Sequence, residues 1–542
     1  MGTWTWVAAV ATVAGLVALI HVPLGHYVHG AFTSERDTRA ERLVYRLTGV
    51  DAHTEQRWSV YALSVVAFSA VSLVVLWLLI VLQGHLPGSL GRSMGLDTAF
   101  NTAASFVTNT NWQSYAGETG AGYLVQALGL TVQNFVSAGV GLAVAVAVIR
   151  GLARQETDRL GNFWVDLTRG VLRVLLPLAF VGAVVLVLGG VIQNLSAPHV
   201  GTTIAGGEQT IQGGLVASQE AIKLAGTNGG GFFGANSAHP FENPTGWTNL
   251  VEMLLILAVP SVLPRVYGLM VDDARQGWTM AGVMAGLGIG GMALTSWLET
   301  SRGGLEGIEQ RFGTAWSGVF ASVTTSTSTG AVDAAHESLT PLVGGVAMLN
   351  MMLGELSPGG VGTGLYSMLV MIVVTVFIAG LTVGRTPELL GKTIGAREIR
   401  LAALAMLVSP ALVLVGTGVA LVLPASKAAL STSGAAGLSE MLYAFTSAAN
   451  NNGSAFAGLA ADQPFLNIVL GLVMLTVRFV PIVAVLALAG GMAGQKRRPV
   501  TAGTMPTDTP TFAVFLVVII VLVAGLTYFP SLALGSIAQG LS

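Results

Sequence analysis

The sequence contains no cysteine, and charged residues make up only 10% of its 542 positions. Without cysteine the chain can form no disulfide, no thiolate metal site and no cysteine nucleophile. The low charge, together with a mean hydropathy of +0.71, lies outside the range of soluble domains. The formal net charge of −2 gives no reason to expect a nucleic-acid partner. The composition therefore indicates an integral membrane protein in contact with lipid.

Apolar runs of membrane-spanning length are abundant in the sequence. Each approaches the ~20 residues that a helix needs to cross a bilayer. The 70 glycines fit helices that pack closely within lipid. We expect about ten membrane-spanning helices, at residues 4–22, 59–82, 123–149, 171–192, 247–270, 278–298, 364–383, 401–423, 465–490 and 512–528.

Four short segments rich in Thr, Asn and Gly lie between pairs of these spans. The segment at residues 226–234 contains three consecutive glycines, which let a ligand approach main-chain carbonyls directly. Each segment follows a small-residue stretch of about three helical turns. Aligned on their last residues, the segments are separated by 118, 101 and 123 positions, which predicts a fourfold internal repeat. The segments are Thr108, Asn109, Thr110 and Asn111; Thr227, Asn228 and Gly229; Thr327, Ser328, Thr329 and Gly330; and Asn450, Asn451, Asn452 and Gly453.

The repeat predicts an all-α membrane protein. Four helix–pore loop–helix units surround a pseudo-fourfold axis, with one extra helix before them and one after. Residues 1–58 hold the first helix and a charged segment, and residues 496–542 hold the last helix. The four repeats are expected at residues 59–150, 151–276, 277–400 and 401–495.

The distribution of Lys and Arg predicts the orientation of the chain. Of the 25 basic residues, 19 fall in the five connecting segments that would share one side of the membrane. Cytoplasmic loops carry an excess of Lys and Arg, so this side is expected to face the cytoplasm. The four loops and both termini would then be extracytoplasmic.

Non-helical backbone at membrane depth is tolerated where it is buried in protein or lines a watery cavity. Four re-entrant loops that meet on one axis could replace the hydration shell of a cation with their carbonyl oxygens. The Thr, Ser and Asn side chains add oxygen ligands suited to a hard monovalent ion. The plainer interpretation is four ordinary external turns. Their corresponding positions and common side favour the ion site.

These segments carry a family resemblance that runs essentially from end to end. Residues 108–115, 226–244, 328–333 and 451–456 resemble those of the potassium-binding A subunit of the bacterial Kdp pump. The resemblance implies a K⁺ transporter of the bacterial cell membrane. It also implies three partners within the Kdp complex: the P-type ATPase subunit, a single-span subunit and a small subunit. In that family the potassium-binding chain selects K⁺ outside and passes it through an internal tunnel to the P-type ATPase chain.

The sequence agrees that ATP is hydrolysed by another chain. It contains no Asp-Lys-Thr-Gly phosphorylation motif and no soluble insert large enough for a nucleotide-hydrolysing domain. Gly391, Lys392 and Thr393 match the end of a P-loop, but Thr386 stands where that motif needs glycine. We therefore expect no nucleotide on this chain. The same loops would also permit a stand-alone K⁺ channel or an ion-gradient-driven transporter, which stays open as the alternative.

Several single residues carry their own expectations. Asn111 replaces the glycine of the other three loops, which predicts an asymmetric ring. Gln113 is either a solvated vestibule residue or one that shapes ion entry. Glu220 and Lys223, three apart on the second pore helix, are expected to form a surface pair and not to bind the ion.

Glu355 and Arg478 fall in otherwise apolar stretches, where an ionisable residue usually faces a cavity or a partner. Glu355 precedes Ser-Pro-Gly-Gly at 357–360, so the second span of the third repeat is expected to be interrupted. We hypothesise that both residues face a polar route off the pore axis and pair across it; an architectural ion pair is the alternative. Arg385 is interpreted as an anchor on the cytoplasmic side. The family resemblance adds a second role, in which it discourages direct flow into the cytosol.

Overall fold

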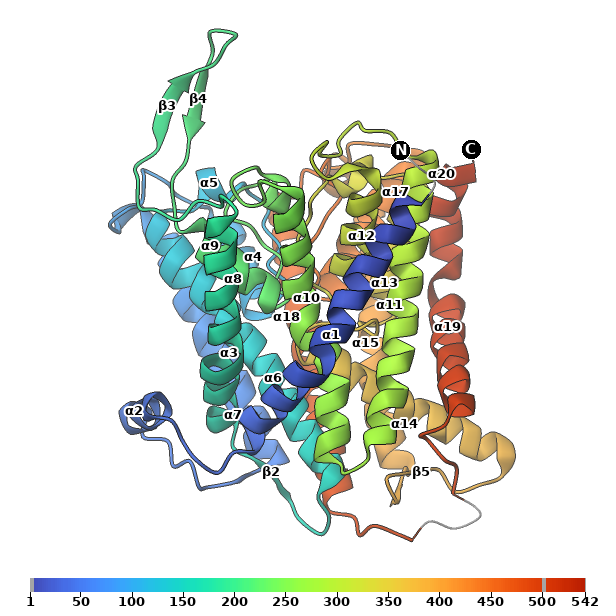
Figure 1. Ribbon diagram of the computed structural model, residues 1–542. Coiled ribbons are helices and arrows are strands. Elements are labelled where there is room, and N and C mark those ends of the chain that lie inside the picture. The colour runs from blue at the N-terminus through green and yellow to red at the C-terminus, as the bar shows by residue number, and fades with distance from the viewer. Residues whose placement is uncertain (1–3, 500–503, 542) are drawn as a thin grey trace.

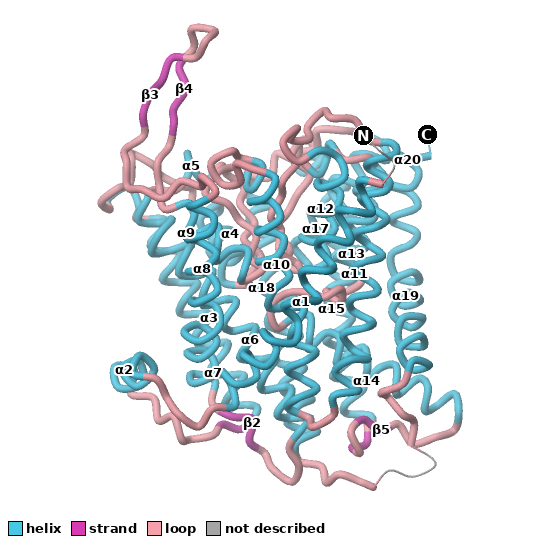
Figure 2. The backbone as a smooth tube through the Cα atoms, viewed as in Figure 1, coloured by secondary structure: helices cyan, strands magenta, loops and turns pink. Residues whose placement is uncertain are grey.

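The computed structural model describes residues 4–499 and 504–541. Within these residues, ten helices are long and apolar enough to cross a membrane, as the sequence predicts. They stand side by side as an upright bundle (Figure 1), and Figure 2 shows the labelled strands confined to the two ends of that bundle. The chain is therefore a multi-pass, all-α membrane protein.

The observed spans agree with the expected ones in number and order. Proline inside α1 does not end the helix, so α1 continues well past residue 22; membrane helices tolerate such prolines because neighbouring groups satisfy the freed backbone. The spans are α1 (Thr5–Thr33), α3 (Trp58–Val81), η2 with α6 (Val125–Ala153), α7, η3 and α8 (Phe163–Leu188), α10 (Gly246–Met270), α11 (Ala274–Arg302), α14 (Thr363–Val383), α15 (Ala396–Val422), α18 (Pro464–Ala493) and α19, η6 and α20 (Pro510–Leu541).

A short helix precedes each of the four Thr/Asn/Gly segments. These pore helices are largely buried and end directly before the segments they lead into. They are α4 (Leu96–Val107), α9 (Val216–Ala225), α12 (Gly313–Ser326) and α17 (Gly434–Ala449). Among the spans of the described residues, the one that contains α6 lies deepest, whereas α15 is the most exposed at the surface of the bundle.

The second span of the third repeat is interrupted, as the sequence predicts. Ten residues separate the end of helix α13 (Pro341–Met352) from the start of α14 at Thr363. Residues Gly354, Glu355, Gly359 and Gly362 have φ values of 80°, 62°, 82° and 85°. A right-handed helix cannot contain such angles, so the chain stays non-helical across this stretch. We call residues 353–362 the interrupted segment.

Two further features were not expected from the sequence. The charged segment after α1 contains an amphipathic helix, α2 (Arg39–Thr48), which begins with a capping box between Thr38 and Glu41. Strands β3 (His199–Thr202) and β4 (Glu208–Ile211) form a hairpin that projects far from the bundle (Figure 1).

The remaining short elements are β1 (Gln56–Arg57), β2 (Arg159–Gly161), β5 (Glu388–Leu389), β6 (Lys392–Thr393), η1 (Gln83–His85), α5 (Gly117–Gly120), η4 (Asn236–Ala238), η5 (His336–Ser338) and α16 (Pro424–Lys427).

Figure 1 places α5, the β3–β4 hairpin and both chain ends at one face of the bundle. Helix α2 and strands β2 and β5 lie at the opposite face. The pore helices occupy the half of the bundle nearest the hairpin. The two faces correspond to the two sides that the sequence predicts, with the basic connections on the face of α2.

Candidate functional site

The four Thr/Asn/Gly segments meet in a closed ring in the order one, two, three, four. Main chain packs directly against main chain at three of the four joints. At each, a Cβ atom on the glycine would overlap a carbonyl oxygen of the next segment. That distance would be 1.6 Å from Gly229 to Thr329, 2.1 Å from Gly330 to Asn452 and 2.0 Å from Gly453 to Thr110. Any other residue at these glycines would force the ring apart.

The joint between segments one and two is made by side chains. Asn109 donates its Nδ2 protons to the carbonyl oxygens of Gly226 and Thr227, at 3.1 and 2.9 Å. Ser137 on α6 donates to Asn109 Oδ1 at 2.8 Å and fixes the orientation of that amide. This joint therefore lacks the glycine contact of the other three, because Asn111 stands at the corresponding position.

The backbone has the same unusual conformation in every segment. The first and third residues of each aligned triplet have positive φ, between 48° and 99°, whereas the residue between them does not. Reversing the sign of φ at alternate residues turns successive peptide planes so that their carbonyls can point to one side. The alternation falls at Asn109 and Asn111, Thr227 and Gly229, Ser328 and Gly330, and Asn451 and Gly453.

Five of these eight positions are not glycine. A non-glycine residue with positive φ costs of order 1–3 kcal/mol and persists where the surroundings enforce it. Such strain concentrates at ligand-binding sites, so its repetition around the ring supports a binding function. The positions with positive φ correspond to one another when the four segments are aligned on their last residues.

The electrostatics of the ring favour a cation. The four pore helices point their C-termini at the segments, and each C-terminus carries a partial negative charge equivalent to about half an electron. The segments themselves contain no Asp or Glu, so their ligands are neutral oxygens. Asn111 Oδ1, Asn228 Oδ1 and Ser328 Oγ are buried there, and none of the described residues offers them a hydrogen bond. Neutral carbonyl and amide oxygens suit a weakly hydrated monovalent ion.

The threonine hydroxyls of segments one and three stabilise the loops. Thr108 Oγ1 lies 2.8 Å from Thr110 Oγ1, and Thr327 Oγ1 lies 2.7 Å from Thr329 Oγ1. Thr108 and Thr327 also donate to carbonyls at the ends of α4 and α12. These bonds hold the loops against their pore helices.

Asn111 and Gln113 connect segment one to its surroundings. Asn111 donates through Nδ2 to Asn134 Oδ1 on α6 at 2.6 Å, which fixes its side chain against that helix. Gln113 is partly buried, and its Oε1 accepts the backbone N–H of Gly231 at 2.8 Å. Gln113 therefore contacts the triple-glycine stretch of segment two.

The interrupted segment lies directly against segments two and three. The N–H of Gly359 donates to Ser326 O, and the N–H of Val361 donates to Thr227 Oγ1, both at 2.9 Å. On its other side, a Cβ on Gly362 would lie 2.0 Å from Gly141 O of α6. The interrupted segment thus fills the space between the ring and α6.

Glu355 and Arg478 line one cavity of ≈ 120 Å³ beside this segment. They are 8% and 4% exposed, and the cavity extends from Asn450 and Asn451 of segment four to α19. Within the described part of the chain no salt bridge joins the two side chains, so they form no direct ion pair, and their pairing across a route stays a prediction. Glu355 Oε2 has no hydrogen-bond partner among those residues. The two charges share the cavity without neutralising each other by contact.

The prediction that Glu220 and Lys223 form a surface pair is wrong. Their side chains are each 1% exposed and meet at 2.7 Å, and Lys223 also contacts Glu242 at 2.9 Å. The three-residue spacing identified the pair correctly. It could not show burial, because the pore helix is enclosed by a long downstream loop.

The structure places Arg385 one residue after Gly384, which ends α14 with a φ of 69°. Its side chain is exposed at the face of the bundle that carries α2. This position agrees with an anchor at the membrane surface. It is remote from the ring, at the far end of α14.

Sequence reasoning missed several residues that contact the ring. Asn134 and Ser137 of α6 bind Asn111 and Asn109, and Asn236 binds the carbonyl of Gly229. A polar side chain within the apolar α6 was the available signal for the first two. Asn236 lies in the 226–244 stretch, whose unusual density of Asn, Gly and Phe had no assigned role.

Comparisons with known proteins agree with this geometry. The family model described as "Potassium-transporting ATPase A subunit" matches residues 11–541. A protein of Kineococcus radiotolerans named potassium-transporting ATPase potassium-binding subunit is 57% identical over 537 residues, covering 97% of this chain and 96% of its own. A protein of the same name from Mycobacterium avium is 56% identical over 542 residues, covering 98% and 97%.

A solved structure has the same fold at low sequence identity. The potassium transporter TrkH from Vibrio parahaemolyticus aligns with a TM-score of 0.53 and 14% identity, covering 88% of this chain and 96% of its own. At that identity the likeness concerns the fold alone. The match of the family model over nearly the whole chain, together with relatives above 50% identity, shows that the chain belongs to the potassium-transporting ATPase A subunit (KdpA) family.

Proposed function

We propose that this chain selects and translocates K⁺ as the non-catalytic subunit of an ATP-driven, high-affinity potassium uptake pump. The observation that carries the proposal is the ring of four loops with repeated positive φ, glycine joints and four converging helix C-termini. Neutral backbone oxygens held rigidly around one axis can replace the hydration shell of K⁺. The ion ligands would be the residues of the four segments, from Thr108 to Asn111, Thr227 to Gly229, Thr327 to Gly330 and Asn450 to Gly453.

The route after the ring would leave the axis sideways. The interrupted segment would block the straight path, since its backbone donates hydrogen bonds to segment two and to the last residue of α12, next to segment three. The cavity lined by Glu355 and Arg478 begins at segment four and leads toward α19. A carboxylate attracts the cation into this space, and an arginine beside it prevents the cation from settling there. Passage to a separate ATPase chain requires such a lateral exit.

The partners of the chain would be those of the Kdp complex. The names of the relatives describe a subunit of a potassium-transporting ATPase, which requires a second chain that hydrolyses ATP. We assign that role to the P-type ATPase subunit of the complex, accompanied by its single-span subunit and its small subunit. The complex would lie in the bacterial plasma membrane, with the ring and both chain ends on the extracytoplasmic side.

The second candidate is a stand-alone K⁺ channel or an ion-gradient-driven transporter. The fold that the chain shares with the potassium transporter TrkH favours this candidate. A straight-through pore would not need the interrupted segment or the two charges beside it. These features favour the pump.

The test is purification from native membranes in a mild detergent, followed by a K⁺-stimulated ATPase assay and identification of copurifying chains. We expect a P-type ATPase chain to copurify and hydrolysis to depend on K⁺. A chain that purified alone and conducted K⁺ in liposomes without ATP would contradict the pump and establish the channel.

A further inference from the structure

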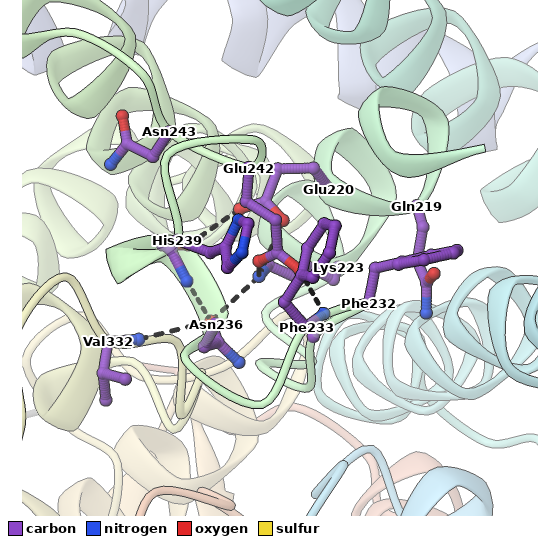
Figure 3. A network of polar contacts seen from close by, with 12 residues as sticks. Gln219, Glu220, Lys223, Phe232, Phe233, Asn236, His239, Glu242, Asn243 and Val332 are labelled. Atoms are coloured by element: carbon purple, nitrogen blue, oxygen red, sulfur yellow. Dashed lines mark hydrogen bonds and ion pairs between the residues drawn. The ribbon is translucent and has the colours of Figure 1, made fainter. Parts of the chain in front are cut away.

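A buried cluster of charges lies beside segments two and three, outside the proposed ion route (Figure 3). Its centre is Lys223 of α9, whose Nζ contacts Glu220 Oε2 at 2.7 Å, Glu242 Oε2 at 2.9 Å and Asn236 Oδ1 at 2.9 Å. An ammonium group has three N–H donors, and these three oxygens use all of them. All three N–H groups of Lys223 are therefore satisfied by side chains within the cluster.

The cluster holds the chain that follows segment two against the pore helix α9. Glu242 Oε1 accepts the backbone N–H of Phe233, and Glu220 Oε1 accepts the hydroxyl of Ser237, both at 2.8 Å. Both carboxylates are at most 1% exposed. Removing the cation from such a site would leave buried charges without compensation, which is strongly destabilising. The loop between residues 230 and 242 is thereby held in one arrangement.

Asn236 links this cluster to the ring. Its Nδ2 donates to the carbonyl oxygen of Gly229 at 3.5 Å, and its Oδ1 accepts the backbone N–H of Val332 at 3.4 Å. Val332 follows Gly330 by two residues, so one amide connects segment two with the chain directly after segment three. Figure 3 shows the contact between Asn236 and Val332. Lys223 and the backbone N–H of Ser237 both donate to Oδ1, at 2.9 and 2.8 Å, and these donors turn Nδ2 toward Gly229.

We propose that Lys223 and Asn236 are positioning residues that set the spacing between segments two and three. The ammonium orients the amide, and the amide holds the Gly229 carbonyl in place relative to the third loop. This inference rests on the proposed function, in which that carbonyl is a K⁺ ligand. Discrimination between cations depends on where the carbonyls lie, so the two residues act on ion affinity and leave the chemistry of ATP hydrolysis untouched.

The decisive variant is Asn236→Asp in the copurified complex. The aspartate keeps an oxygen for Lys223 but places an acceptor against the carbonyl of Gly229, where the amide donated. Asn236→Gly removes the amide without repulsion, and glycine accepts the local φ of 55°. Asn243→Asp is the matched control: it alters an amide of the same loop that bonds to Asn249 and Thr248 of α10.

We expect Asn236→Asp to raise the KM for K⁺ of the ATPase about tenfold, the effect of losing about one buried hydrogen bond. The ratio of K⁺ to Na⁺ stimulation should fall with it, while kcat stays unchanged. Asn236→Gly should shift both quantities in the same direction, and Asn243→Asp should shift neither. A KM that stays constant while the Tm falls would show that the cluster only stabilises the fold, and would overturn the proposal.

A second readout separates this inference from the proposed function. Should the wild-type complex show no K⁺-stimulated hydrolysis, the pump assignment fails, but K⁺ binding can still be measured on the full chain. K⁺ should then raise the Tm of the wild-type chain more than Na⁺ does. Loss of that difference in Asn236→Asp, but not in Asn243→Asp, would support the positioning role, and its retention would contradict it.

Discussion

The carbonyl oxygen of Thr329 lies 1.6 Å from the point where residue 229 would carry a Cβ atom. Segments two and three therefore touch through glycine backbone alone at this joint. Gly229 also has a φ of 93°, which other L-residues rarely adopt. Two independent constraints, one on conformation and one on space, require glycine at this position.

The Gly229→Ala substitution should consequently disturb the ring with a single methyl group. We expect the KM for K⁺ of the ATPase complex to rise by at least about tenfold, which corresponds to a loss of about 1.4 kcal/mol in ion binding. Gly229→Asp should be more severe, because it adds a charge. Gly286→Ala on α11 is the control, since none of the described residues beyond the adjacent turns of that helix lies within 4 Å of its Cβ position. Equal KM values for Gly229→Ala and the control would contradict the ring.

Asn111→Gly tests the asymmetry of the ring. The Asn111 amide donates a hydrogen bond to Asn134 at 2.6 Å, and glycine would remove this bond. The last residue of all four segments would then be glycine. We expect the variant to accept a wider range of cations, with K⁺/Na⁺ preference reduced about tenfold, comparable to the loss of one buried hydrogen bond. Ion competition in the ATPase assay measures this. Unchanged affinity and preference would show that Asn111 has no part in selection.

Glu355→Gln and Arg478→Met test the lateral route. Glu355→Gln removes a charge and keeps the shape of the side chain, and Arg478→Met removes a charge and keeps an unbranched apolar stem, so the ring should still bind K⁺. We expect ATP hydrolysis to continue with fewer K⁺ ions moved per ATP, measured as flux in liposomes. Ser367→Ala, an uncharged change in the same cavity lining, should leave the ratio unchanged. Normal coupling in both charge variants would rule out the route.

Arg385→Gln tests the second role proposed for the residue at the end of α14. If the arginine discourages direct flow, its loss should raise passive K⁺ leak through the complex in the absence of ATP, since like charges repel strongly where water is scarce. A surface anchor would give a different result. Lower yield in the membrane with no change in leak would assign Arg385 to anchoring alone.

The orientation of the chain can be tested at the β3–β4 hairpin. An epitope inserted between residues 203 and 207 should be reached by antibody in intact spheroplasts, because these exposed residues project on the side of the ring. The same epitope inserted near Glu156, on the opposite face, should be reached only after the membrane is opened. The reverse pattern would invert the proposed topology.

Much of the fold could be predicted because hydropathy reports membrane-spanning helices directly. The ten spans follow from runs of apolar residues, and the interruption follows from Glu355 and the Pro-Gly-Gly that comes after it. Helix ends were harder to predict, since α1 continues past Pro23 where a soluble helix would stop. Helix α2 was not expected, because Arg39, Arg42 and Arg46 hide its amphipathic pattern in a charged stretch.

The site was predictable at the level of segments and much less so at the level of partners. The repeated Thr, Asn and Gly positions located all four loops. Lys223 is buried because the loop after residue 230 folds back over it. The sequence around Lys223 contains no pattern that predicts this long-range contact. The same limit applies to Glu355 and Arg478, which are far apart in sequence and share a cavity without touching.

The ring is assembled from one polypeptide, and this has a genetic consequence. In a pore made of four identical chains, one codon change alters all four quarters together. Here a codon change at Gly229, Gly330 or Gly453 alters one quarter and leaves three intact. The sequence of each segment can therefore change independently of the other three. Segment one already differs, because it has Asn111 where the others have glycine. Ion preference in such a protein can evolve through single substitutions, and selection acts on the effect of each one separately.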